Sequence, residues 1–334
     1  MATATTTRTA EKTTTAIARR PADRGAVVAA AHVDLDGAWT GGPEDASLRR
    51  LRTIDARAWG PRLRFSAPRS EIEAFYEFIA LRLGEAQFIA YGSGDFHHLS
   101  ALWLRRAFSC LPEEQRLTLV SFDNHPDWDI RPPAWCCGSW INRALELPGV
   151  EKISIWGLGS FESWGWHRLV GNHRDARGGR LTVQAWADLR NAADQAQSKS
   201  IRRDNWREKF TRFAATLEGQ TLYVTIDLDC LREGEAVTNW ENGFFSADDV
   251  RWALRELRAH GAQIVAGDLC GAWSPPGYAR WKQCFAATMD HPKFPDPDPA
   301  ATLQTNLATF RTLWPALTGR DEHDTDGDEQ RAGD

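Results

Sequence analysis

Residues 117–129 read LTLVSFDNHPDWD, an apolar run that ends in three acidic residues and a histidine. Residues 220–229, QTLYVTIDLD, have the same form, with an apolar run followed by two acidic residues. Short apolar runs without alternation are typical of strands that are buried on both faces of a parallel sheet. The two segments therefore predict parallel strands whose carboxyl ends carry acidic side chains.

Similar apolar runs recur along the chain, and amphipathic stretches separate them. Helices are predicted over residues 70–85, 99–108, 138–147, 201–217 and 246–261, and strands over 86–91, 117–122, 152–159, 220–229 and 262–269. Ser246 is a favourable N-cap for the last helix, and Gly261 suits the position after its C-terminus. Strands that alternate with helices predict a three-layer α/β/α fold with a mainly parallel sheet.

The length of 334 residues suits one large α/β domain, and no internal repeat or linker interrupts residues 70–290. We therefore expect one domain at residues 25–318, with disordered tails at 1–24 and 319–334. Lys and Arg number 40 and Asp and Glu 45, and the acidic tail at 319–334 accounts for the whole net charge of −5. The remainder is neutral overall, which argues against nucleic acid as a partner.

No apolar run approaches the roughly 18 residues that a membrane-spanning helix needs, so no membrane association is expected. Residues 1–24 lack the apolar segment of a secretory signal, and the six cysteines form no CxxC pair. These features predict reduced thiols and a cytoplasmic location.

Acids and histidines follow four of the predicted strands, where parallel sheets usually carry their active sites. The candidate metal ligands are His97, His98, Asp123, His125, Asp127, Asp227 and Asp229, and Asp268 ends a further strand. Unpaired carboxylates at one edge would repel one another, and divalent cations would remove that conflict. Side chains at i, i+2 and i+4 of an extended segment share a face, so the DNHPD residues can point into one site. Mixed carboxylate and imidazole ligands favour manganese, zinc or iron.

Each motif also has a structural interpretation. Asp123 can cap a turn, and the DLD pair at residues 227–229 can be a solvated strand end. The earlier segment HVDLD, at residues 32–36, also contains a histidine and two aspartates. We interpret that segment as a structural strand end.

Five segments resemble motifs of the arginase (ureohydrolase) superfamily and occur in the same order. They are GSGDFHHLS (92–100), DNHPD (123–127), TIDLDCL (225–231), TNWENG (238–243) and GDLCGAWSPP (267–276). The resemblance spans roughly residues 85–280. The FDNHPD form is more similar to an atypical branch that includes arginases converting Arg to ornithine within peptides.

The resemblance implies an arginase-like fold and two divalent ions, expected to be Mn²⁺. It places Asp123 and Asp227 between the ions, Asp127 with His97 or His98 on one ion, and His125 with Asp229 on the other. Phe96 separates Asp95 from both histidines, which leaves the choice between them open.

Two departures concern the substrate and the proton donor. Asp268 stands in place of the family's late glutamate, which holds the guanidinium. The family's proton-shuttling loop histidine falls near Trp140, and His167 and His173 are candidate replacements.

The expected activity is hydrolysis of a guanidino group by a metal-bridging hydroxide, which releases urea and an amine. Asp268 and Glu241 are expected to hold the substrate's positive charge. The substrate is a small guanidino compound or an Arg-containing peptide, and an oligomer is compatible with the family. Two alternatives stay open: a deacetylase-type amidohydrolase with a single zinc, and a non-catalytic metal-containing protein that binds a peptide.

Tryptophan is unusually frequent, at sixteen residues. Eight follow or flank the predicted strand ends: Trp128, Trp135, Trp140, Trp156, Trp164, Trp166, Trp240 and Trp273. Indole faces can receive a guanidinium by cation–π contact. We therefore predict an aromatic-walled mouth over the metal site.

Overall fold

A computed structural model describes residues 29–40, 48, 50–131, 135–160, 169–188, 190–196 and 200–320. The predicted N-terminal tail, most of the acidic tail, Trp164, Trp166 and His167 lie outside these residues. No helix among the described residues is long and apolar enough to cross a membrane.

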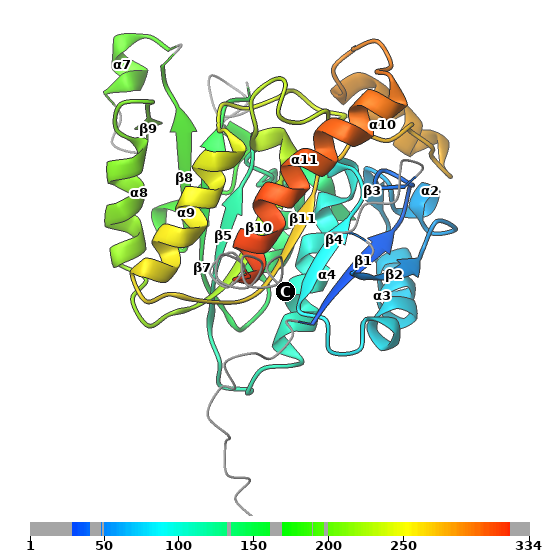
Figure 1. The fold of residues 1–334 in the computed structure, drawn as a ribbon, viewed down its shortest axis with the longest axis horizontal. Coiled ribbons are helices and arrows are strands. Elements are labelled where there is room, and N and C mark those ends of the chain that lie inside the picture. The colour runs from blue at the N-terminus through cyan, green and yellow to red at the C-terminus, as the bar shows by residue number, and fades with distance from the viewer. Residues whose placement is uncertain are drawn as a thin grey trace, which may run out of the picture.

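Nine strands form one sheet in the order β2-β1-β4-β11-β10-β5-β7-β8-β9, and every neighbouring pair is parallel (Figure 1). The strands are β1 (Ala30–Asp34), β2 (Arg52–Asp55), β4 (Phe88–Tyr91), β5 (Leu117–Phe122), β7 (Val150–Leu158), β8 (Leu181–Trp186), β9 (Ser200–Ile201), β10 (Thr221–Asp227) and β11 (Gln263–Cys270). A separate antiparallel pair joins β3 (Ser66–Ala67) to β6 (Trp135–Cys136).

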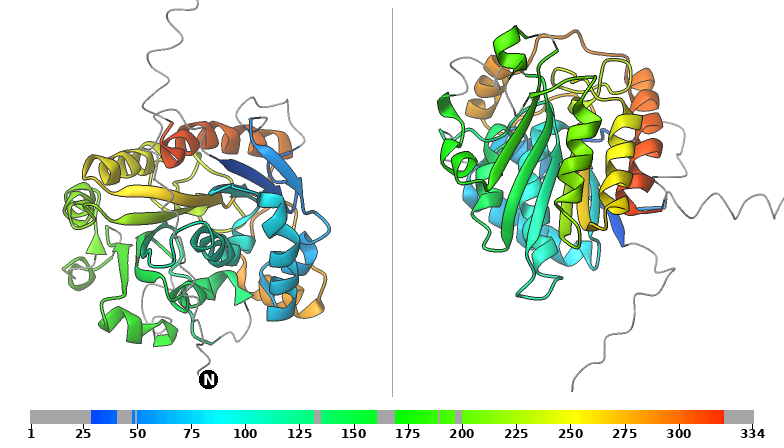
Figure 2. Two further views of the ribbon diagram at one scale, coloured as in Figure 1. Left: turned by 90° about the horizontal axis from the view of Figure 1, so that it is seen from below. Right: turned by 90° about the vertical axis from the view of Figure 1, so that its left-hand side faces the viewer.

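Helices cover both faces of the sheet (Figure 2). On one face lie α3 (Arg69–Leu83), α4 (Ser100–Phe108) and α5 (Trp140–Leu145), and on the other α8 (Trp206–Ala215), α9 (Ala247–Ala259) and α11 (Pro299–Thr318). The remaining helices are α2 (Gly60–Leu63), α6 (His173–Arg177), α7 (Ala192–Gln195) and α10 (Trp281–Asp290). The predicted three-layer α/β/α fold is confirmed.

The central strands contribute side chains to two separate cores, because successive side chains point to opposite faces of the sheet. In β5, Leu119 packs with the core under α3 to α5, and Val120 packs with the core under α8, α9 and α11. Such double burial explains why the strand sequences read as continuous apolar runs.

The predicted elements lie close to the observed ones, with one clear exception. The Ser246 hydroxyl accepts a hydrogen bond from the Asp249 N–H as the N-cap of α9, and Gly261 has φ +81°, as the sequence predicts. The helix predicted over 201–217 begins only at Trp206. Ser200 and Ile201 instead pair with β8 as the edge strand β9, which delays the helix.

The HVDLD segment is structural, as interpreted from the sequence. Asp34 pairs with Arg57 at 2.7 Å, and Asp36 accepts a hydrogen bond from the Ser93 N–H at 3.0 Å. Neither carboxylate, nor His32, belongs to a group of described residues that could hold a metal.

His32 should make the protein less stable in acid. Burial lowers the pKa of its imidazole to about 4, although Asp34 opposes this shift. Between pH 6.5 and 4 the unfolded chain then binds a proton that the folded chain excludes. Relative to His32→Gln, the free energy of unfolding should fall by about 1.4 kcal/mol for each pH unit in this window. Urea unfolding at several pH values measures it, and equal pH profiles for the two proteins would contradict it.

Candidate metal centre

The strands β4, β11, β10 and β5 are neighbours in the sheet, so their carboxyl ends meet at one edge. His97 lies on a 3₁₀ helix (Gly94–Leu99) that follows β4, and Asp123, His125 and Asp127 lie in the loop after β5. Asp227 ends β10 and begins a second 3₁₀ helix (Leu228–Cys230) that contains Asp229. All six side chains are nearly inaccessible to solvent.

The first set of potential ligands surrounds the His97 imidazole. Its Nδ1 lies 3.2 Å from Asp123 Oδ2, 3.2 Å from Asp127 Oδ2 and 3.3 Å from Asp227 Oδ2. The second set is Asp123, His125 and Asp229, with His125 Nδ1 2.9 Å from Asp229 Oδ2. Asp123 belongs to both sets.

His98 is not part of this arrangement. It is fully buried one residue beyond His97 and belongs to none of the potential metal-binding groups among the described residues. Burial and the neighbouring His97 lower the pKa of its imidazole to about 3. The structure thus favours His97 in the choice that the sequence left open, and His98 lies outside both potential ligand sets.

The DNHPD side chains meet at one site, but their backbone conformation differs from the predicted extended segment. They do not form an extended strand after Phe122, and Asp127 has φ +44°, a left-handed conformation that is uncommon for residues other than glycine. The loop turns so that Asp127 joins the first set and His125 joins the second. Such backbone strain is often found at functional sites.

The electrostatics of the site fit bound cations. Burial raises the pKa of the Asp123, Asp227 and Asp229 carboxyls, and each is raised further by a neighbouring carboxylate. Asp123 Oδ2 is buried and accepts no hydrogen bond in the described structure. The cavity over these residues has a volume of about 30 Å³, close to that of one water molecule. It gives room for a small ion between the side chains that line it.

Asp268 lies elsewhere than expected. Its carboxylate is fully buried and accepts hydrogen bonds from Thr225 at 2.7 Å, from Ser100 at 3.0 Å and from Tyr223. It does not line the cavity. Thr225 Oγ1 also lies 3.0 Å from His97 Nε2, so Asp268 is connected to the back of the His97 ring through Thr225. Asp268 therefore lies behind His97, in a potential metal-binding group with His97 and Cys270, and the structure does not bring it to the cavity that a substrate's charge would enter.

Trp140, at the position expected for a loop histidine, has a structural role at the site. Its indole Nε1 donates a hydrogen bond to Asp127 Oδ2 at 2.6 Å, and its ring centroid lies 4.8 Å from that of His97. It therefore orients one carboxylate of the first set. Of the two proposed substitutes for the histidine, His173 packs edge-on to Trp128 and does not line the cavity.

Replacing Trp140 by phenylalanine should lower metal affinity by about 10- to 100-fold, because partners that orient metal ligands have effects of this size. Trp103→Phe is the matched control: Trp103 is equally buried, and its Nε1 makes no hydrogen bond in the described structure. Competition with a fluorescent chelator measures the affinity. An equal loss of affinity in both variants would show that the effect comes from core packing.

The rim of the cavity contains residues that were not candidate metal ligands in the sequence. Besides the ligands, it is lined by Gly94, Cys137, Gly138, Trp240 and Asp290. Glu241, half-exposed, has its Oε2 3.6 Å from His125 Nε2, which agrees with the expected position beside the metal site. Asp290 lies beyond the motifs quoted above, and no sequence signal marked it.

The aromatic-walled mouth is wrong in its predicted extent. Trp128, Trp140 and Trp156 are core residues, and Trp156 packs against Phe210 on the face away from α4. Trp240 is the tryptophan of the described set that lines the cavity, and it also lines a neighbouring surface groove of about 410 Å³ together with Trp273. The indoles of Trp128, Trp140 and Trp156 fill the cores because a wide flat ring buries much apolar area.

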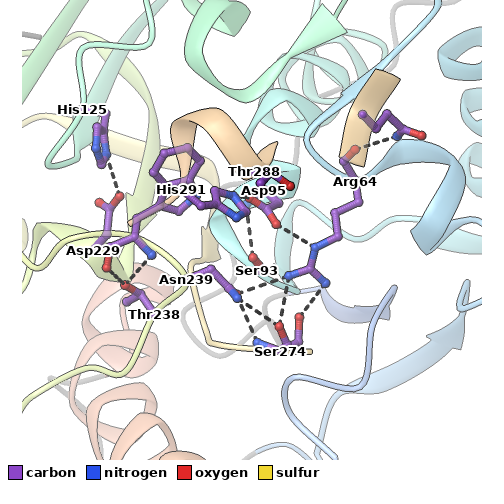
Figure 3. A network of polar contacts seen from close by, with 12 residues as sticks. Arg64, Ser93, Asp95, His125, Asp229, Thr238, Asn239, Ser274, Thr288 and His291 are labelled. Atoms are coloured by element: carbon purple, nitrogen blue, oxygen red, sulfur yellow. Dashed lines mark hydrogen bonds and ion pairs between the residues drawn. The ribbon is translucent and has the colours of Figure 1, made fainter. Parts of the chain in front are cut away.

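A buried polar network supports the rim (Figure 3). Arg64, 1% exposed, donates to Asp95 Oδ2 at 2.6 Å and to Ser274 Oγ at 2.9 Å. Asp95 Oδ1 lies 2.6 Å from His291 Nε2. Although burial opposes its ionisation, Arg64 and His291 hold the pKa of the Asp95 carboxyl at about 2. The network ties the segment before β3, the loop after β4 and the end of α10 together.

No protein-family model and no curated protein matches the sequence. The structure is similar to that of a hypothetical agmatinase from Burkholderia thailandensis (16% identity, TM-score 0.50, covering 90% of this chain and 88% of that one). It is also similar to proclavaminate amidino hydrolase from Streptomyces clavuligerus (15% identity, TM-score 0.50, covering 90% and 95%). At these identities the likeness concerns the fold, and the chain has the α/β architecture of these two structures over nine-tenths of its length.

Proposed function

We propose that the protein is a hydrolase that cleaves a guanidino group, with two divalent cations held at the edge of the sheet. The observation that carries the proposal is the pair of ligand sets that share Asp123. His97, Asp127 and Asp227 would hold one ion with Asp123, and His125 and Asp229 would hold the other. The folds of the two similar structures, whose names are those of amidino-group hydrolases, agree with this assignment.

Two cations at this position would supply hydroxide near neutral pH and would polarise the group under attack. The residues of the chain prepare the site for that chemistry. Trp140 fixes Asp127, and Thr225, itself bonded to Asp268, lies at the Nε2 side of His97 and leaves Nδ1 facing the three carboxylates. A group that hydrogen-bonds to the other ring nitrogen of a ligand histidine sets the tautomer and the orientation of that ring.

A second carboxylate–imidazole set favours two ions over the single zinc of a deacetylase-type enzyme. A single-ion site needs one Asp-His-Asp set, and here the two imidazoles face different carboxylates. Carboxylates from two separate segments, the loop after β5 and the end of β10, would also remain buried beside one another with only one ion present.

We further propose that the guanidino group is an arginine side chain within a peptide, converted to ornithine with release of urea. The cavity of about 30 Å³ has room only for the reacting group, so the rest of the substrate would lie at the rim. The adjoining groove, which shares Trp240 with the cavity, gives room of about 410 Å³ for flanking residues. Its lining includes Phe294 and Pro295 and the acids Glu233 and Asp296, but neither Lys nor Arg.

A substrate panel tests the proposal. Arginine, agmatine, Nα-acetyl-arginine amide and Arg-containing peptides should be incubated with manganese-loaded protein, and urea should be measured. We expect urea from the peptides at a kcat/KM well above that for free arginine. Preference for free arginine or agmatine would refute the peptide assignment. Absence of urea from every compound would refute the guanidino hydrolase.

A further inference from the structure

Asp290 is an acidic residue at the rim of the cavity, although it lies after the arginase-like motifs in the sequence. It is the last residue of α10 and lines the cavity together with the ligand residues and Trp240. Its side chain is exposed, and burial nevertheless raises the pKa of its carboxyl, against the opposing charges of His125 and His291. An exposed carboxylate is available to a ligand.

The position of Asp290 is fixed by its neighbours on α10. Gln283, 2% exposed, donates to the carbonyl oxygens of Arg64 at 2.7 Å and Ser66 at 2.8 Å. At the other end of the helix, His291 lies 2.6 Å from Asp95 (Figure 3). Its ring packs edge-on to Trp240, with ring centroids 4.5 Å apart. The helix therefore presents Asp290 to the cavity from a rigid support.

A second observation points to a ligand at the same place. Asp123, 1% exposed, lines this cavity, and its Oδ2, which lies 3.2 Å from His97 Nδ1, accepts no hydrogen bond with good geometry from a described residue. Asp123 Oδ2 is thus a buried acceptor beside the cavity that can still bind a ligand. At its rim the cavity has the indole of Trp240, which is able to contact a cation. Glu241, next in the chain, has its carboxylate beside His125.

We propose that Asp290 determines the preference of this site for a cationic group, by pairing with the substrate's guanidinium opposite Glu241 and beside Trp240. The inference rests on the proposed function. It assigns to Asp290, on α10, the role of holding the substrate's positive charge, which was expected of Asp268 from the sequence. It explains how the site selects a cation although Asp268 is buried away from the cavity. Two carboxylates at the rim would orient a planar guanidinium through its several N–H donors.

The test compares Asp290→Asn with the wild type, both loaded with manganese. Isothermal titration calorimetry would use Nα-acetyl-ornithine amide as a cation that is not hydrolysed and Nα-acetyl-citrulline amide as its neutral counterpart. We expect Asp290→Asn to bind the cation about tenfold more weakly, because hydrogen bonds to charged groups carry that much binding energy. The neutral compound should bind both proteins equally. KM for Nα-acetyl-arginine amide should rise about tenfold with little change in kcat.

Two further variants separate charge from structure. Asp290→Glu should keep the preference for the cation, and Glu113→Gln removes an exposed carboxylate before β5, at the opposite edge of the sheet, and should change nothing. Equal binding of the cation by Asp290→Asn and the wild type would overturn the inference. So would an equal loss for both probes, which would indicate a structural role. A wild type that releases no urea refutes the proposed function, whereas the calorimetric comparison still reports on Asp290.

Discussion

Replacing Asp123 by alanine should lower urea release from the manganese-loaded protein by at least about 10³-fold. Asp123 is the residue shared by the two ligand sets, so its loss weakens the hold on both ions. The ions are expected to contribute several kcal/mol to stabilisation of the transition state, and each 1.36 kcal/mol is about tenfold in rate. The fold should survive because the variant removes a buried carboxyl whose pKa burial and Asp127 already raise. Steady-state kinetics and circular dichroism measure the two effects.

Asp129→Ala is the matched control for that variant. Asp129 belongs to the same loop but pairs with the exposed side chain of Arg131 and lies in neither ligand set. Its activity should stay within about threefold of the wild type, since surface ion pairs contribute little. Comparable losses in the two variants would mean that the loop matters as a whole and that Asp123 has no special role.

Replacing Arg64 by methionine should destabilise the protein by about 3–5 kcal/mol, because it leaves the buried Asp95 carboxylate without its main partner. The guanidinium also donates to the carbonyl oxygen of Ser274 at 3.1 Å, and all these groups are buried. The variant should weaken activity too, because the network that holds the end of α10 at the rim passes through Asp95 and His291. Guanidinium chloride unfolding at pH 7 gives the free energy.

Arg57→Met provides the comparison. Arg57 pairs with Asp34 at 2.7 Å, nearly the same distance as Arg64 and Asp95, but its side chain is 54% exposed and that of Arg64 is 2% exposed. The exposed pair should contribute no more than about 1 kcal/mol. If the two variants lost the same free energy of unfolding, burial would not be what makes the Arg64 pair important.

The fold could be predicted because its signals are local. The strand predicted at 117–122 matches β5 residue for residue, and β10 differs from its prediction only at the ends. In each case the strand is buried on both faces, so its residues are apolar along its length. The acidic residues begin where the strand leaves the core. The cap at Ser246 was predictable for the same reason, because a capping hydroxyl acts on residues three positions away.

The site was predictable in its residue types but not in its contacts. His97 and His98 are adjacent in sequence, and only the turn of the 3₁₀ helix decides which ring faces the carboxylates. Asp268 follows a strand like the ligands do, yet the hydroxyls of Ser100, Tyr223 and Thr225 enclose it. Asp290 lies at the rim because α10 packs against residues 64–66. These contacts join positions more than 200 residues apart, and no local sequence pattern predicts them.

The most direct test of the two-ion centre is a metal count. Metal-free protein would be dialysed to equilibrium against excess Mn²⁺, and bound metal would be measured by inductively coupled plasma mass spectrometry. We predict two ions per chain for the wild type and fewer than one tightly bound ion for Asp123→Ala. A wild type that binds no metal, or that holds a single ion, would contradict the two-ion centre at this edge of the sheet.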